Sequence, residues 1–215
     1  ANKLLKDVGM DRFRAAPCPE ALSPIHPLFE ASDRVELSTD QPLPEIPKKL
    51  WGKTDYPYER ASDFIAAYTQ GQTTPSQVAE RLIKRIEHLE GQDPALCCVI
   101  EQRAEDLRAQ ARESTARYAQ GNPLGPLDGV PVGVKDELDL KGYSSRVGTS
   151  FMGAEPARQD AFAVHGLRTA GALLFGKLNM HEIGIGVTGI NPHYGAARNP
   201  HDLSCITGGS SSGSA

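Results

Sequence analysis

Lys135 is the first side chain in the sequence whose setting suggests chemistry. It follows residues 130–134 (VPVGV), in which three valines alternate with proline and glycine. This alternation predicts a strand that delivers the lysine at its carboxyl end, where ligand sites of open α/β sheets often lie. An amine partly removed from water is less inclined to carry charge, so it can accept a proton from a serine hydroxyl. Without such a context, a lysine is usually solvated or ion-paired.

A second segment of interest, residues 207–215 (TGGSSSGSA), consists mainly of glycine and serine. By composition alone it is typical of a flexible linker, because small polar residues do not form a core. The alternative is a tight catalytic loop, since glycines permit backbone conformations that bring hydroxyls and amides to one point. A third interpretation, anion binding by the loop amides, lacks the GxxxxGK[ST] order of phosphate-binding loops.

Both segments need a scaffold, and the intervening sequence predicts alternating helices and strands. The helix after Thr74 has the clearest start, with a capping hydroxyl, Pro75 at the first helical position and Gln77 able to return the hydrogen bond. Its apolar residues recur on one face: Val78, Leu82, Ile86 and Leu89. Gly91 ends it.

The remaining pattern favours an α/β fold. We expect Gly176 to end the last strand, and the glycine- and asparagine-rich sequence beyond Asn179 to be irregular. The expected helices cover residues 62–70, 75–90, 104–118 and 161–170, and the expected buried strands cover 96–100, 130–134 and 172–175.

The amino-terminal residues 1–58 are rich in proline and show no sustained periodicity. We interpret them as an extended arm, for which Trp51 is a candidate anchor. The regular body then covers residues 59–215.

Composition excludes some classes of function. A net charge of -4 gives no broad cationic field, so nucleic acid is not an expected partner. His181 and His193 lack companion residues at metal-ligand spacing, and the cysteines show no zinc pattern, so no metal site is expected. Buried thiols in a reducing intracellular compartment, cytoplasmic or organellar, fit the cysteines best: Cys18, Cys97, Cys98 and Cys205.

Four segments together resemble the amidase-signature family of serine hydrolases. Residues 126–136 (PLDGVPVGVKD) are similar to its lysine segment, and 207–215 to its first serine segment. Between them, 170–184 (AGALLFGKLNMHEIG) and 189–202 (GINPHYGAARNPHD) occur in the family's order and approximate spacing. The residues in these motifs are most similar to those of the branch that contains the plant fatty acid amide hydrolases. The resemblance implies a mixed sheet flanked by helices, of which this chain holds an amino-terminal part.

The resemblance also implies roles for individual residues. Lys135 and Ser210 would relay a proton from a second, nucleophilic serine, with a cis peptide bond between Gly209 and Ser210. Ser211 would support this loop by hydrogen bonding. Residues that align with a substrate-channel stretch of the plant enzymes are Ile185, Val187, which replaces a threonine, and Thr188.

The implied activity is hydrolysis of an amide through an acyl-enzyme, with no cofactor and with fatty acid amides or N-acylethanolamines as candidate substrates. We expect the nucleophile to belong to a segment beyond Ala215, so that these 215 residues alone are inactive and need the rest of the domain or a companion chain. A place in a larger complex and contact with a membrane surface are compatible with this interpretation. The alternative is an inactive amidase remnant that serves as a structural subunit.

Overall fold

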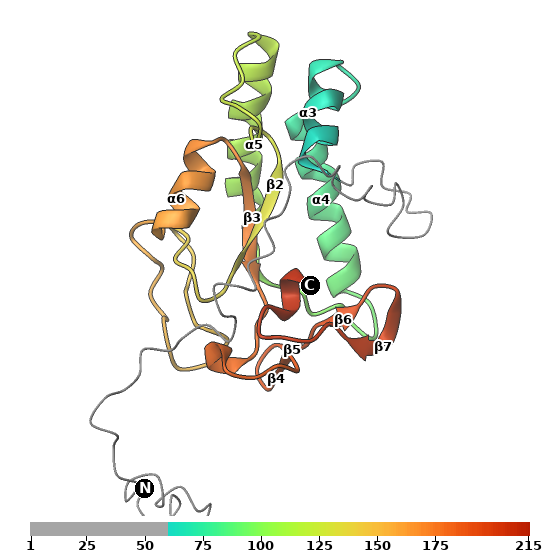
Figure 1. Ribbon diagram of the computed structural model, residues 1–215, viewed down its shortest axis with the longest axis vertical. Coiled ribbons are helices and arrows are strands. Elements are labelled where there is room, and N and C mark those ends of the chain that lie inside the picture. The colour runs from blue at the N-terminus through green and yellow to red at the C-terminus, as the bar shows by residue number, and fades with distance from the viewer. Residues whose placement is uncertain (1–59) are drawn as a thin grey trace, which may run out of the picture. The chain divides into compact units, whose positions relative to one another are not determined.

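A three-stranded sheet forms the centre of the part of the chain that the structure, a computed structural model, describes, residues 60–215 (Figure 1). The arm expected over 1–58 lies outside the described residues. None of the helices in residues 60–215 combines the length and the apolar composition that a membrane-spanning helix needs. The principal elements are α3 (Ala61–Thr69), α4 (Pro75–Glu90), β1 (Val99–Glu101), α5 (Ala104–Ala119), β2 (Pro131–Lys135), α6 (Phe162–Thr169) and β3 (Leu173–Leu178).

The sheet is mixed, as expected, with strand order β1-β3-β2. Strands β2 and β3 are parallel, because α6 provides the crossover that returns the chain to the same end of the sheet. The short strand β1 pairs with β3 in the antiparallel direction. Lys135 and Leu178 are register partners, so β2 and β3 end side by side.

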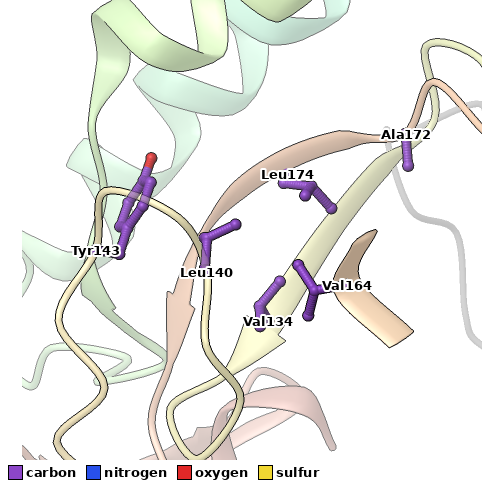
Figure 2. Packing of buried hydrophobic residues seen from close by; sticks show 6 residues of the cluster. All are labelled: Val134, Leu140, Tyr143, Val164, Ala172 and Leu174. Atoms are coloured by element: carbon purple, nitrogen blue, oxygen red, sulfur yellow. The ribbon is translucent and has the colours of Figure 1, made fainter. Parts of the chain in front are cut away.

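One face of the sheet is covered by α6 (Figure 2). Val134 of β2 and Leu174 of β3 pack against Val164 of α6, together with Leu140 and Tyr143 from the segment that follows β2. These side chains are at most 2% exposed, so this apolar layer holds the carboxyl end of β2 firmly in place.

The opposite face of the sheet is covered by α4 and α5 (Figure 1). Ile83 of α4 and Leu107 of α5 pack on Leu173 of β3. The capping box predicted at the start of α4 is confirmed, since the Thr74 hydroxyl and the Gln77 side chain exchange hydrogen bonds with backbone amides. The predicted apolar face is slightly rotated, because Ala79 and Ile83 are buried whereas Leu82, Ile86 and Leu89 are half-buried.

The strand predicted over 96–100 is wrong at its start, because β1 begins only at Val99 and is half-buried rather than buried. The carboxylate of Glu90 accepts hydrogen bonds from the amides of Cys97, Cys98 and Val99 at 2.8, 2.9 and 3.0 Å. A side chain of α4 therefore takes the donors that a strand ladder would use.

Strand β3 continues through Gly176 to Leu178, so the prediction that this glycine ends the strand is also wrong. Gly176 has a φ of 157°, and a Cβ there would collide with the backbone carbonyl of Glu101. The glycine thus permits the close approach of β1 and extends β3 to the site.

The cysteines differ from the expectation of buried thiols. Cys97 and Cys98 are half-buried and Cys205 is exposed, and all three are free. Burial raises the pKa of Cys98 to about 11, so this thiol stays protonated at neutral pH.

The chain after β3 is irregular, as predicted. It contains two short antiparallel strand pairs, β4–β5 and β6–β7, and two 3-10 turns. The second turn, η3, packs against β2 and β3. The elements in chain order are η2 (Glu182–Gly184), β4 (Ile190–Asn191), β5 (Gly195–Ala196), β6 (Arg198–Asn199), β7 (Asp202–Ile206) and η3 (Ser212–Ser214).

A buried carboxylate, Asp128, joins α5 to the turn before β2. It accepts two hydrogen bonds from Arg117 at 2.7 and 2.8 Å, one from the Ser114 hydroxyl at 2.7 Å and one from the Leu124 amide at 2.9 Å. Burial alone would raise the pKa of Asp128, but these four donors outweigh it and hold the pKa below its usual range.

We expect Asp128→Ala to destabilise the complete native protein by about 2–4 kcal/mol, because Arg117 and Ser114 would lose their shared acceptor. Thermal melting measures this effect, and Glu113→Ala, on an exposed position of α5, is the matched control. Because the folded-state pKa of Asp128 is lowered, its contribution is present at neutral pH and is lost as the pH falls through that value. Equal melting temperatures for both variants would contradict the prediction.

Candidate active site

The structure brings Lys135 and Ser210 together, although 75 positions separate them in the chain. The Lys135 Nζ donates a hydrogen bond to the Ser210 Oγ at 2.9 Å. Lys135 is the last residue of β2, and its side chain is 14% exposed. An amine and a hydroxyl at this distance can exchange a proton directly.

The loop that carries Ser210 has the cis Gly209–Ser210 bond expected from the resemblance. The carbonyl of Ser210 accepts a hydrogen bond from the His181 amide at 2.9 Å, so the segment that follows β3 bonds directly to this loop. Farther along the loop, the Thr207 hydroxyl donates to the Ser212 carbonyl at 2.8 Å. The loop is therefore held at both sides of Ser210 and is not a flexible linker.

Glycine is required where this loop meets the preceding segment. Gly208 and Gly189 have φ values of 86° and 70°, which other residues rarely adopt. A Cβ on Gly209 would lie 2.6 Å from the Gly189 nitrogen. Close backbone contact thus places residues 186–189 against the Ser210 loop.

The hydroxyl of Ser211 makes no hydrogen bond within residues 60–215 and is exposed, although its carbonyl accepts one from the Ser214 amide at 3.0 Å. The side-chain support that the sequence suggested at Ser211 comes instead from Thr207. The Ser212 hydroxyl is buried without a partner among the described residues.

Ile185, Val187 and Thr188 lie in the segment that contacts the Ser210 loop. Ile185 and Val187 are 83% and 79% exposed, so their apolar side chains are available to a ligand or to another segment. The Thr188 hydroxyl lies 3.4 Å from the His181 Nδ1. The His193 Nε2 lies 2.8 Å from the Glu182 Oε1.

A buried ion pair below the site was not predicted. Lys177 of β3 is fully buried and lies 3.6 Å from the equally buried carboxylate of Asp136. Its Nζ donates to the Leu138 carbonyl at 2.6 Å and to the Ser145 hydroxyl at 3.0 Å. Burial raises the pKa of Asp136 and lowers the pKa of Lys177, while their mutual attraction opposes both shifts.

This pair organises the chain after β2. Asp136 accepts a hydrogen bond from the Gly148 amide at 2.8 Å. This bond joins the two ends of the loop over residues 136–148. The acidic run after Lys135 was the signal for Asp136 in the sequence, but the partner of Asp136, Lys177, lies on another strand.

Two buried asparagines were also missed. Asn179 donates to the carbonyls of Cys97 and Gly195 at 2.8 and 3.1 Å, and its own carbonyl accepts from Gly213 at 2.8 Å. Asn191 donates to the carbonyls of Gly148 and Met180, both at 2.8 Å. A polar amide directly after the apolar strand β3 is the signal that could have identified the first of them.

The geometry defines the class of this site. Some serine hydrolases use a lysine as the base, and in them the lysine amine is hydrogen-bonded to a serine hydroxyl. The same pair lies here at the carboxyl ends of two parallel strands. The described residues place one lysine amine and one serine hydroxyl in this arrangement.

Comparisons with known proteins agree with this class. The family model described as Amidase matches residues 77–215. A fatty acid amide hydrolase of Oryza sativa subsp. indica is 44% identical over 187 residues, which cover 85% of this chain and 31% of the rice protein. The chain therefore belongs to the amidase family, and it spans about a third of the length of the curated relatives it matches.

Solved structures share the fold. The native peptide amidase from Stenotrophomonas maltophilia matches with a TM-score of 0.69 and 30% identity, over 74% of this chain and 34% of that chain. A structure described as an unexpected vestigial protein complex, which reveals the origins of an s-triazine catabolic enzyme, matches with a TM-score of 0.67 and 37% identity, over 72% and 34%. The observed mixed sheet with flanking helices is thus part of an amidase-signature fold.

Proposed function

We propose that the complete protein hydrolyses amides with Lys135 as the base and Ser210 as the proton carrier. The observation that carries this proposal is the 2.9 Å hydrogen bond from the Lys135 Nζ to the Ser210 Oγ. The nucleophile would be a serine outside these 215 residues, in the remainder of the domain or in a companion chain.

Two protons would move when the nucleophilic serine attacks the substrate. As the nucleophilic serine attacks the amide carbonyl, its proton passes to the Ser210 Oγ while the proton of Ser210 passes to the Lys135 Nζ. The same path, run in reverse, protonates the departing amine when the C–N bond breaks. A water molecule then attacks the acyl-serine ester, and its proton passes through Ser210 to Lys135. When the bond between the serine Oγ and the acyl carbon breaks, that proton returns along the same path to the serine, and the carboxylic acid leaves.

We further propose that the substrate is an amide with a long apolar acyl chain. The support is twofold: the rice relative is a fatty acid amide hydrolase, and Ile185 and Val187 present apolar side chains next to the Ser210 loop. Apolar side chains with a few polar groups are typical of sites for such ligands.

The test is labelling of the complete native protein with a fluorophosphonate, which reacts with activated serines. We expect labelling that depends on Lys135, and faster hydrolysis of a long-chain N-acylethanolamine than of acetamide. Absence of labelling would overturn the hydrolase proposal and favour a structural subunit. Equal rates on the two amides would overturn only the substrate proposal.

A further inference from the structure

The Lys135 amine has a second close partner, the carboxylate of Glu137. The Glu137 Oε1 lies 3.1 Å from the Lys135 Nζ, which at the same time donates to the Ser210 Oγ at 2.9 Å. The Lys135 side chain is 14% exposed and that of Glu137 is 41% exposed. The carboxylate is therefore more exposed than the amine that it contacts.

The turn after β2 explains why the two side chains meet. The Leu138 amide donates to the Lys135 carbonyl at 3.0 Å, which closes a tight turn over residues 135–138. Asp136 points toward the Gly148 amide, whereas the side chains on either side of it, Lys135 and Glu137, meet each other. A Cβ on Gly184 would lie 3.3 Å from the Glu137 Oε2, so packing as well as charge positions this carboxylate.

Other charged groups around the site have partners of their own. Asp136 pairs with Lys177 of β3, and Glu182 of η2 pairs with His193. His181 lies beside Thr188. The backbone amide of Arg146, and not its guanidinium, donates to Asp136 at 3.4 Å. Within residues 60–215, Glu137 is the one carboxylate that forms an ion pair with Lys135.

We propose that Glu137 is a member of the proton relay that orients the Lys135 amine and stabilises its ammonium form. Burial favours the neutral form of an amine, whereas a carboxylate in contact favours the ammonium form. Lys135 would take the ammonium form when it accepts the proton of Ser210. Glu137 would thus stabilise the product of the proton transfer. This inference rests on the proposed role of Lys135.

The experiment is a pH profile of kcat/KM for the complete native protein and its Glu137→Gln variant, which keeps the size of the side chain and removes the charge. We expect kcat/KM on the acid limb of the profile to rise roughly three-fold, the effect of losing a partly exposed ion pair. At the plateau we expect kcat to fall, because the ammonium form loses its partner. Asp139→Asn is the matched control, since this exposed neighbour has no ion pair within residues 60–215.

The possible results separate the two proposals. An acid limb that moves for Glu137→Gln and not for Asp139→Asn, at an unchanged melting temperature, supports the inference. If Lys135→Ala abolishes activity but the limb of Glu137→Gln stays in place, or moves equally in the control, Glu137 has no such role and the hydrolase proposal stands. If Lys135→Ala remains active, the proposed relay and this inference both fail.

Discussion

Lys135→Ala is expected to lower kcat/KM for amide hydrolysis by about 10²–10⁴-fold, the usual contribution of a positioned acid–base group. The structure places the Lys135 Nζ 2.9 Å from the Ser210 Oγ, and its described partners are Ser210 and Glu137. Alanine removes the amine while leaving the β2 backbone and its pairing with β3 intact. The measurement is steady-state hydrolysis of an N-acylethanolamine by the complete native protein.

The matched control for this substitution is Lys141→Ala. Lys141 also lies in the segment after β2, but it is exposed and its backbone amide, not its amine, bonds to Asp160. We expect wild-type activity for the control. Activity within ten-fold of the wild type for Lys135→Ala would show that the lysine is not the base.

Ser210→Ala is expected to reduce kcat/KM by a comparable factor, about 10²–10⁴-fold, because the path between the nucleophile and Lys135 would be interrupted. The loop itself should persist, since the His181 amide bonds to the Ser210 carbonyl rather than to its hydroxyl. Ser214→Ala, at an exposed serine of the same loop, is the control. An equal loss in both variants would indicate a general effect on the loop instead of a role for the Ser210 hydroxyl.

The two substitutions should also be combined. Groups that act as one unit are not additive, so the double variant should lose little more than either single variant. Fully multiplicative losses would mean that Lys135 and Ser210 act in separate steps, contrary to the relay.

Many elements of the fold could be predicted because their signals are local. The capping box around Thr74 and Gln77 and the alternating valines of β2 depend on neighbours within a few residues. The resemblance of four ordered segments predicted the amidase family, the cis bond before Ser210 and the pairing of that serine with Lys135. Composition alone favoured a flexible linker for residues 207–215, and only the resemblance argued otherwise.

Only the tertiary structure determined the contacts between segments that are remote from one another in the sequence. β3 continues through Gly176 because only a glycine tolerates the close approach of the Glu101 carbonyl. Lys177 can be buried because the carboxylate of Asp136, directly after β2, compensates its positive charge. Glu137 is close to Lys135 in sequence, yet its direction depends on the turn that the buried Asp136 imposes. Local patterns specify which residues can form an element, whereas the cost of burying an unpaired polar group or charge decides how those elements must meet.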